Sequence, residues 1–413
     1  MFTSKSAKTA GYSPSADQIA GDEDLLTEIL LLLPPKSLLR FQSVSKQWLS
    51  LISNPQFRRH HSRRNPNSLT TALFLFRSLY TYRSQFNFVF LEDQENQTNP
   101  IFSYHFLNFV DWVSEIRSFH SCNGLFCVYV STNWHRGYFY IYNPTTNQSI
   151  KLPLSDRPEI AHIEALNLAF DPSKSPHYKV VCVWESIGST YQFSTYTSET
   201  GLWRDSGESL ISEPLDDNDN CRHFFGKGVF WNGAIHWVSK SDPFVCFDVD
   251  RECFKPMPTT PIPEGRLKRK IKYFGESGGH LYLIEDNGPR KKLLDVLEME
   301  IDYSKWFVKY HVDLDAMFVA FPHMVPSVLD PYTMTFHDFN ILCLLQEEKE
   351  EKSRLLLSIR GKSSPKVFSY DLSDMTVREL PVTIPRHFHL NVKGLWRCKW
   401  YYAYQYSETL ACV

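Results

Sequence analysis

Residues that could carry out bond chemistry are present in this chain, but their spacing matches no common catalytic signature. GESGG, Gly275–Gly279, is followed by a strand pattern and not by a helix, so we do not interpret it as the G-x-S-x-G nucleophile elbow of a hydrolase. GKGVFWNG, Gly226–Gly233, has glycines at the wrong spacing for a dinucleotide-binding loop, and no G-x-x-x-x-G-K-[ST] phosphate loop occurs. We interpret both pieces as turns between strands. The sequence therefore predicts a chain that is not an enzyme.

Metal-ligand patterns are also missing from the sequence. Cys122 and Cys127 are separated by four residues in an apolar strand pattern, and His60–His61 and His387–His389 have no Cys or carboxylate companions at zinc spacing. We expect packing or surface histidines, and we predict no metal and no cofactor. The carboxylates of SEPLDDNDN, Ser212–Asn220, are typical of a solvated loop, and an acidic recognition patch is the alternative.

Composition and charge narrow the class of protein. At 413 residues the chain exceeds the size at which one core stops growing, roughly 250–300 residues, so more than one folding unit is expected. The formal charge of −2 gives no field that would recruit nucleic acid or membrane. The most apolar stretch, Leu25–Leu33, is far shorter than the ~20 residues of a membrane helix. The basic clusters FRRHHSRR, Phe57–Arg64, and RLKRK, Arg266–Lys270, are expected to be solvated faces, with a nuclear address or a polyanion contact as the alternative.

The cysteines indicate the compartment. Nine are present, an odd number, and most lie inside apolar runs, as small buried hydrophobic residues do. The first 24 residues contain no apolar segment typical of a secretory signal. Free thiols in a reducing compartment are therefore expected, which places the protein in the cytoplasm, the nucleus or both.

Helical spacing is confined to the N-terminal part of the chain. Residues 1–18 are small and polar and are predicted to be a disordered tail. Asp22 is predicted to cap a first helix that Pro34–Pro35 ends. Two more short helices follow, and Asn54–Pro55 is predicted to close the third. The apolar positions at helical spacing in the first helix are Leu25, Leu26, Ile29, Leu30 and Leu33.

The first helix has more leucine than one packed face requires. Leu31 and Leu32 are predicted to lie off the face made by Leu25, Ile29 and Leu33. Three short helices cannot hold themselves together by their own core, so the surplus must pack on another surface. That surface is either the protein's own β domain or a separate partner polypeptide, and the residues by themselves favour neither.

Beyond Pro66 the pattern becomes one of short apolar and aromatic strands separated by Asn, Asp, Gly, Pro and Ser. A strand, a turn and a second strand recur at about 50 residues, the spacing of four-stranded propeller blades. Turns with glycine precede most copies. Strands between Leu69 and Phe119 either complete the ring or form a separate lid. Trp203, Trp231, Trp237 and Trp306 recur at comparable places, and we expect them to pack between blades, with a recognition surface as the alternative.

The stretch DLLTEILLLLPPKSLLRFQSVSKQWLSLISNPQF, Asp24–Phe57, resembles the F-box, a helical module that docks onto the Skp1-type adaptor of cullin–RING ubiquitin ligases. The resemblance covers roughly residues 19–60. One departure is that Gly21–Asp22 stands where the family usually has Leu-Pro, so one apolar adaptor contact is missing. The resemblance implies that ten positions form the core and adaptor face of the module: Leu25, Leu26, Ile29, Leu30, Leu33, Pro34, Leu38, Leu39, Val44 and Trp48.

The β region resembles the F-box-associated domain of large plant F-box families, which is related to kelch repeats. The resemblance covers about 120–410 and rests on CNGLFCV, YNPTTNQSIKLP, FDPSKSPHYKVV, TYTSETGLWRD, GVFWNGAIHWV and YQYSETL. The expected fold is α+β and multidomain: a tail at 1–18, a three-helix F-box at 19–65, and an all-β, propeller-like domain at 66–413. The resemblance implies a non-catalytic substrate receptor of an SCF-type ubiquitin ligase. The alternatives are a scaffold that does not promote degradation and a propeller that binds or hydrolyses glycans.

Overall fold

The computed structural model describes residues 22–65, 70–79, 82–91, 115–132, 136–154, 162–186, 190–211, 227–240, 243–262, 269–286, 293–314, 317, 321, 339–346, 352–359, 366–380 and 402–413. The predicted tail at 1–18 lies outside these residues. Contacts divide the chain into a helical unit, Met1–Pro66 with Pro172–Pro176, and a β unit, Asn67–Asp171 with His177–Val413. We describe each unit by itself.

The described residues of the helical unit form four helices, one more than predicted. The Asp22 carboxylate caps the first by accepting from the backbone N–H groups of Asp24 and Leu25, as predicted. Asn54–Pro55 closes the third helix, as predicted, since that helix ends at Ser53 with Asn54 as its C-cap. The same pair also opens a further helix, because the Asn54 side chain accepts from the Gln56 N–H at 2.8 Å and Pro55 occupies the first helical position. The helices are α2 (Glu23–Leu30), α3 (Pro35–Phe41), α4 (Lys46–Ser53) and α5 (Pro55–Arg64).

The unpredicted helix α5 holds the helical unit together. The His61 ring lies 2.8 Å from the Leu33 carbonyl oxygen, and the Asn65 amide donates to the Leu31 carbonyl at 3.1 Å. These contacts satisfy carbonyl groups left unpaired where α2 ends. The Arg64 guanidinium pairs with Glu28 and lowers the pKa of that carboxyl. His61 and Arg64 of the basic cluster therefore have structural roles.

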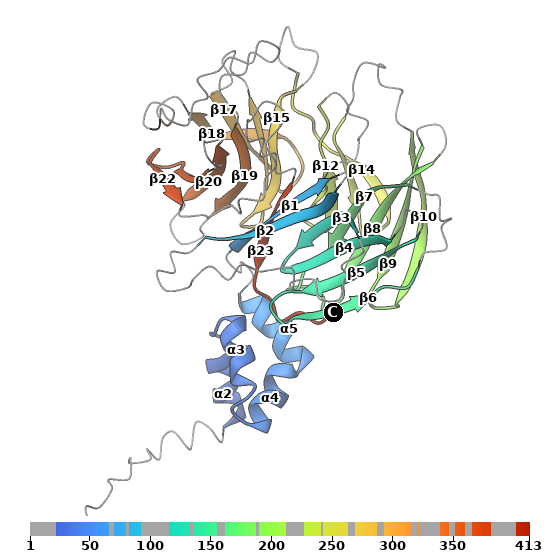
Figure 1. Ribbon diagram of the computed structural model, residues 1–413, viewed down its shortest axis with the longest axis vertical. Coiled ribbons are helices and arrows are strands. Elements are labelled where there is room, and N and C mark those ends of the chain that lie inside the picture. Colours follow the sequence, from blue (N-terminus) through green and yellow to red (C-terminus); the bar gives the residue numbers. More distant parts are fainter. Residues whose placement is uncertain are drawn as a thin grey trace, which may run out of the picture. The chain divides into compact units, whose positions relative to one another are not determined.

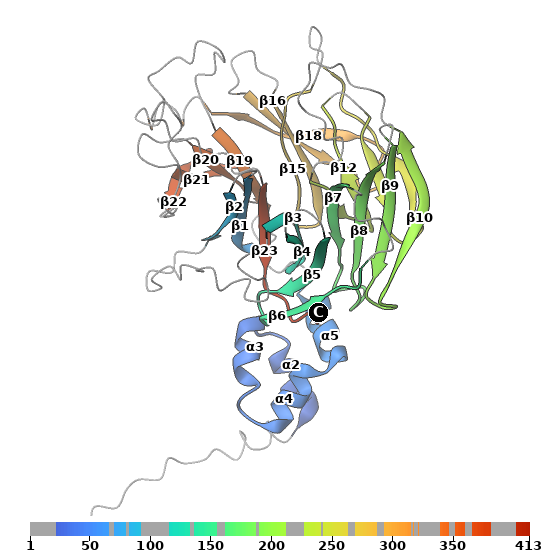
Figure 2. The same ribbon diagram turned by 45° about the vertical axis from the view of Figure 1, so that its right-hand side comes forward.

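In the residues that the structure describes, the β unit is a propeller of five four-stranded antiparallel sheets, or blades, and one three-stranded sheet (Figures 1 and 2). The first blade contains β3 (Glu115–Cys122), β4 (Leu125–Thr132), β5 (Arg136–Asn143) and β6 (Gln148–Lys151), and the second contains β7 (His162–Ala169), β8 (Lys179–Ser186), β9 (Thr190–Thr197) and β10 (Leu202–Ile211). The third blade contains β11 (Val229–Trp231), β12 (Ala234–Trp237), β13 (Val245–Asp248) and β14 (Cys253–Pro256), and the fourth contains β15 (Ile271–Ser277), β16 (His280–Asp286), β17 (Leu293–Met299) and β18 (Trp306–Asp313). The fifth blade contains β19 (Phe339–Gln346), β20 (Ser353–Ile359), β21 (Lys366–Asp371) and β22 (Val377–Leu380).

The sixth sheet closes the ring. It has the order β2 (Tyr82–Phe90), β1 (Thr70–Leu79), β23 (Tyr402–Ser407), so strands from both ends of the β unit share it. The innermost strands β3, β7, β11, β15, β19 and β23 contact one another in that cyclic order, and β23 contacts β3. The early strands therefore complete the ring and do not form a lid. This confirms the all-β, propeller-like expectation.

The recurring sequence pieces are the hairpin turns of the blades. Asn123–Gly124 and Asn232–Gly233 have positive φ at both residues and join the first two strands of their blades. A single left-handed residue occurs in all five hairpins between third and fourth strands: Asn147, Gly201, Glu252, Tyr303 and Met375. Gly124 is required for closure, because a Cβ there would lie 2.5 Å from the Ser407 carbonyl oxygen.

The four repeated tryptophans pack within and between blades, as expected. Trp231 and Trp237 are buried. The Trp203 indole donates to the Pro153 carbonyl at 2.8 Å and the Trp306 indole donates to that of Pro258 at 2.9 Å, in each case reaching the preceding blade. These contacts explain the repeated tryptophans without a recognition surface.

Replacing Asn143 with alanine should destabilise the β unit by about 2–4 kcal/mol. The buried Asn143 amide donates to the Ala411 carbonyl at 2.7 Å and to that of Thr409, which fastens the C-terminal segment. Its oxygen also accepts from the backbone N–H of Thr145 at 2.9 Å. Urea unfolding measures the loss.

The matched control is Asp371→Ala. Asp371 forms the same turn in the fifth blade, accepting from the Ser373 N–H at 2.8 Å, but holds no C-terminal segment. The Asp371→Ala substitution should lower the free energy of unfolding by only about 1 kcal/mol. Equal losses for the two variants would contradict a special role of Asn143 in closing the ring.

Candidate functional site

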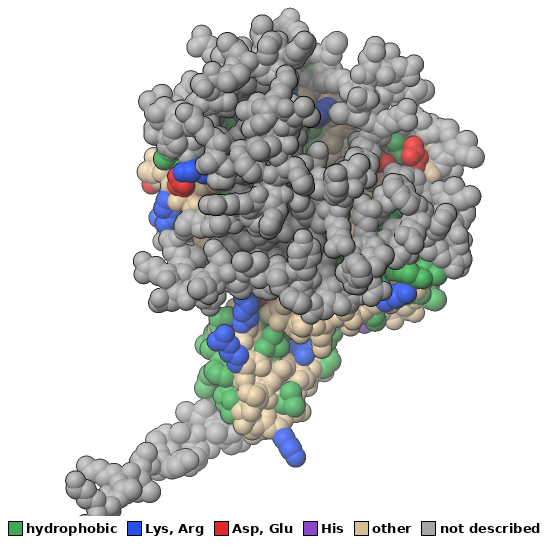
Figure 3. Space-filling model, viewed as in Figure 1, with side chains coloured by type: hydrophobic (Ala, Val, Ile, Leu, Met, Phe, Trp, Pro, Cys, Tyr) green, Lys and Arg blue, Asp and Glu red, His purple; other side chains and the backbone are tan. Residues whose placement is uncertain are grey.

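Helix α2 exposes an apolar face that the helical unit does not cover. Leu25 is 51% exposed, Ile29 46% and Leu32 66%, whereas Leu26 and Leu30 on the opposite side are buried. Apolar side chains accordingly lie on the surface of this unit, coloured green in the lower part of Figure 3. The unit therefore satisfies its own core and still presents leucine and isoleucine to the outside. An apolar face of this kind marks a protein-contact surface.

The ten residues predicted from the resemblance separate into three groups by burial. The sequence predicted that the five apolar positions of the first helix share one face, but in the structure they fall into all three groups. Buried residues form the core, half-buried residues border it, and exposed residues are free to contact a partner. The buried ones are Leu26, Leu30 and Leu38; the half-buried ones are Leu33, Leu39 and Trp48; the exposed ones are Leu25, Ile29, Pro34 and Val44.

Two exposed apolar residues were missed, and one expectation was wrong. Leu32 and Leu49 are exposed but were not among the ten. Leu31 was expected to share the outer side with Leu32, yet it is fully buried. Leu31 keeps helical backbone angles and its N–H donates to the Thr27 carbonyl oxygen at 2.9 Å, so helical geometry continues through it. Leu32 follows Leu25 by seven residues and Ile29 by three, which places it on their exposed face, contrary to the prediction that it lies off that face.

The segment between α3 and α4 is rigidly positioned. The Ser45 hydroxyl caps α4 by accepting from the Trp48 N–H at 3.2 Å, and the Ser43 hydroxyl donates to the Arg40 carbonyl at 2.8 Å. The Trp48 ring packs edge-on against Phe41, with centroids 5.4 Å apart. The exposed Val44 is thereby held in one place, and little conformational entropy is lost when a partner covers it.

The axis of the propeller contains polar side chains that connect distant blades. His120 of β3 accepts from the Leu168 N–H at 3.1 Å through Nδ1, and its Nε2 lies 2.8 Å from the Gly228 carbonyl oxygen. Gln405 of β23 donates to the carbonyl oxygen of Glu276 at 2.9 Å. Burial lowers the pKa of His120 to about 4, so the ring is neutral and its tautomer is fixed by these two contacts.

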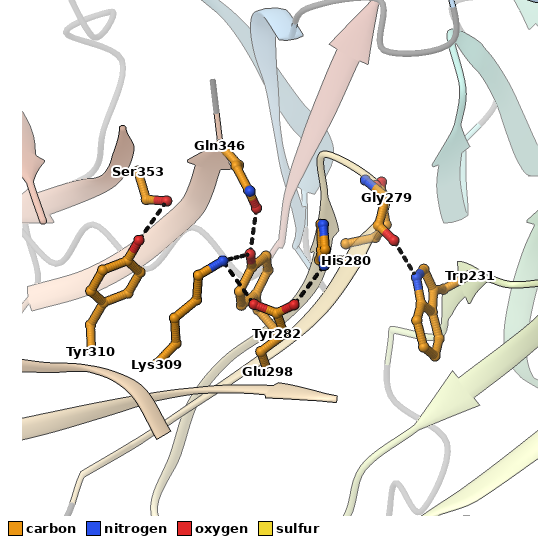
Figure 4. Close-up of polar contacts among 10 residues, drawn as sticks. Trp231, Gly279, His280, Tyr282, Glu298, Lys309, Tyr310, Gln346 and Ser353 are labelled. Carbon is orange, nitrogen blue, oxygen red and sulfur yellow. Dashed lines mark hydrogen bonds and ion pairs between the residues drawn. The ribbon is translucent and has the colours of Figure 1, made fainter. Parts of the chain in front are cut away.

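A second polar cluster connects the fourth and fifth blades (Figure 4). The buried Glu298 carboxylate pairs with His280 at 2.6 Å and with Lys309 at 2.8 Å. The Lys309 ammonium also donates to the Tyr282 hydroxyl at 2.9 Å, and that hydroxyl contacts Gln346 of β19. Burial opposes the charge of Glu298, but the hydrogen bonds from His280 and Lys309 hold its pKa at about 2. The charged groups of this cluster thus pair with one another and link neighbouring blades.

A polar hollow of about 310 Å³ lies between the third-to-fourth-strand hairpins of the second and third blades. The Lys179 ammonium donates to the Asp250 carboxylate at 2.8 Å within it. Three cationic and three acidic side chains line it, so it has no net charge: Lys179, Arg204, Arg251, Glu199, Asp250 and Glu252.

The structure offers no support for the catalytic or metal motifs weighed from the sequence. Ser277 of GESGG is buried in the β15–β16 hairpin, where its hydroxyl accepts from the Gln346 N–H at 2.9 Å. Within the described residues, no group of three His, Cys, Asp or Glu side chains could hold a metal ion. No helix among those residues is long and apolar enough to span a membrane. His387–His389 and Ser212–Asn220 lie outside the described residues.

Comparison with known proteins gives two family matches. Residues 22–60 match the F-box domain, and residues 71–312 match the F-box associated beta propeller domain. An Arabidopsis thaliana F-box protein, At5g07610, is 34% identical over 402 residues, covering 92% of this chain and 90% of that protein. The F-box/kelch-repeat protein At3g23880 of the same plant is 24% identical and covers 59% of this chain and 66% of its own length.

Among solved structures, TolB from Acinetobacter baumannii aligns with a TM-score of 0.33 at 13% identity, covering 63% of this chain and 54% of that one. No argument rests on a similarity this weak. The two family matches cover both units of the chain, and the plant relative spans nearly all of it. The chain belongs to the plant F-box proteins that carry a C-terminal F-box associated beta propeller domain.

Proposed function

We propose that this protein is the substrate-recognition subunit of an SCF-type E3 ubiquitin ligase, in which the helical unit binds a Skp1-like adaptor and the propeller holds the target protein. The observation that carries the proposal is the exposed apolar face of α2, with Leu25, Ile29 and Leu32 outward while the core of the unit is separately filled. Covering such a face with a partner stabilises the complex by roughly 25 cal/mol per Å² of apolar surface.

In the proposed mechanism the chain performs no bond chemistry. It contributes proximity: one unit tethers the ligase and the other tethers the target, so that ubiquitin transfer by other subunits occurs at a high effective concentration of target. The site of action that we propose is the cytoplasm, the nucleus or both. The buried free thiols Cys122, Cys127 and Cys182 are in keeping with a reducing compartment.

Reconstitution tests the proposal. The full-length chain should form a stable one-to-one complex with a Skp1-like adaptor on gel filtration, and the complex should join a cullin–RING assembly. In cells, ubiquitylated target should accumulate with the intact chain and not with a chain that cannot bind the adaptor. A chain that stays monodisperse alone and ignores the adaptor at micromolar concentration would contradict the proposal.

Two alternatives are separated by the same experiments. Adaptor binding without any ubiquitylated target would favour a scaffold that does not promote degradation. Hydrolysis or binding of glycans without adaptor binding would favour a propeller of a different class. The buried position of Ser277 in a turn weighs against a serine hydrolase, because a nucleophile must reach substrate.

A further inference from the structure

Lys227 crosses the axis of the propeller. The residue immediately precedes Gly228 and strand β11, and its ammonium donates to the carbonyl oxygen of Ala403 in β23 at 2.7 Å. In the cyclic order of innermost strands, β11 and β23 stand opposite each other. The ammonium also lies 4.4 Å from the centroid of the Tyr404 ring. This side chain therefore spans the centre of the ring, where the blades surround a common axis.

The groups around this ammonium supply no negative charge. His120 faces it as a neutral ring, and the Cys343 thiol, whose pKa burial raises, faces it from β19. The Tyr404 hydroxyl is used in a hydrogen bond to the Phe119 carbonyl oxygen. In the part of the chain that the structure describes, no carboxylate pairs with Lys227. Burial lowers the pKa of Lys227 to about 8, which is the expected response of a cation held away from water.

A buried lysine without a counter-charge is costly. An ammonium has three donors, and the described contacts use one of them together with the face of one aromatic ring. Lysine is almost never buried unless it is paired, and burying an uncompensated charge costs several kcal/mol. A negative group that the described contacts do not include is therefore needed to explain why the protein has a cation at this position.

Connecting the blades does not itself require a charge. Gln405 links β23 to the carbonyl oxygens of Glu276 at 2.9 Å and Leu344 at 3.3 Å with a neutral amide. A neutral side chain at position 227 could make the same kind of link to Ala403. The positive charge thus has a use that the hydrogen bond to Ala403 does not explain. Lys227 is half-buried as a residue, so part of it borders solvent even though its ammonium is largely removed from water.

We propose that Lys227 is the anchor of an oxyanion site on the propeller axis, and that it binds a carboxylate or phosphate group. The inference rests on the proposed function and deepens it, since an acidic or phosphorylated side chain of the target would supply such a group. A free small anion has the same chemistry. Beside the Tyr404 ring and the neutral His120, the ammonium of Lys227 supplies the positive charge that would select the ligand.

Thermal unfolding of the full-length protein tests the site. Three probes are compared at equal ionic strength with sodium chloride: inorganic phosphate, a hexaglutamate peptide and a phosphoserine-containing peptide. Phosphate or a peptide should raise the unfolding midpoint of the wild type in a saturable way. Lys227→Met should reduce the apparent affinity at least about fivefold. Without any probe this variant should be as stable as the wild type or more so, because an unpaired charge has been removed.

The matched control is Lys151→Met, because Lys151 also lies over a tyrosine ring, that of Tyr138, at 3.3 Å. This variant should respond as the wild type does. Response to peptides alone assigns the group to the target protein, and response to inorganic phosphate alone assigns it to a free anion; either supports the site. As a second measurement, lysine amines reductively dimethylated with carbon-13 formaldehyde and a borohydride reductant should show a resonance titrating near pH 8 whose apparent pKa rises with the probe.

Several outcomes would overturn the proposal. The first is a wild type whose unfolding midpoint none of the three probes raises. The second is a Lys227→Met variant whose midpoint rises as much as that of the wild type. The third is a Lys227→Met variant that is much less stable than the wild type without a probe, which would show that Lys227 has a structural role alone. Adaptor binding is measured on the same samples. An intact adaptor complex together with any of these outcomes rejects the oxyanion site alone, whereas loss of adaptor binding by the wild type rejects the proposed function.

Discussion

Ile29→Asp should weaken binding of a Skp1-like adaptor by about a hundredfold or more, while the propeller remains folded. The Ile29 side chain is 46% exposed on α2, so aspartate is solvated in the free protein and costs little stability. In the complex the same carboxylate would be buried without a partner, which costs several kcal/mol. Leu25→Asp should behave alike, because Leu25 lies on the same face. Isothermal titration of the full-length chain with the adaptor measures the change.

Two controls make this result specific. Leu202→Asp replaces an equally exposed leucine of the propeller, 59% exposed, and should leave adaptor binding unchanged. Leu30→Asp places a charge at a fully buried position and should unfold the helical unit, so its loss of binding says nothing about the surface. Retention of full affinity by both Ile29→Asp and Leu25→Asp would show that the adaptor does not use this face.

Acid should destabilise the propeller well above the pH at which ordinary carboxyl groups titrate. Burial lowers the pKa of both His120 and His236 to about 4, whereas an unfolded histidine titrates near pH 6.5. Between these pH values the unfolded chain binds protons at these histidines and the folded chain does not. The contribution of the two neutral rings to the free energy of unfolding is therefore fully present above pH 6.5 and decreases as the pH falls towards 4. Each histidine contributes roughly 3 kcal/mol to this loss, a large fraction of a typical stability of 5–15 kcal/mol.

Other buried groups act in the opposite direction and must be separated. Burial raises the pKa of Glu276 and of Glu285, so these carboxyls favour the folded state as the pH falls. The test is the free energy of unfolding in urea at several pH values between 7.5 and 4.5. His120→Asn should flatten the slope between pH 6.5 and 5, because the substitution removes one of the two buried rings. An unaltered slope in His120→Asn would contradict the neutral buried ring.

Local signals in the sequence predicted much of the architecture. The Asp22 cap, the break at Pro34–Pro35 and the asparagine–glycine turns depend on a few neighbouring residues, and each occurs as expected. Short apolar and aromatic runs separated by turn residues, recurring at about 50 residues, indicated the blades for the same reason. The helix α5 was missed because Asn54–Pro55 was interpreted only as the end of one helix, whereas it both ends α4 and starts α5. Contacts of α5 with the end of α2, which lie far away in the sequence, hold the additional helix.

The sequence by itself determined that a leucine-rich helical module precedes a β repeat, since propensity, spacing and turn chemistry are local properties. Only the tertiary structure decided which leucines face outward, because Leu25 and Leu26 have the same chemistry and differ only in what lies beside them. It also decided that strands from both ends of the β unit, Thr70 opposite Ser407, share one sheet. His120 and Lys227 meet on the axis for the same reason: contacts between residues a hundred positions apart leave no periodic trace in the chain.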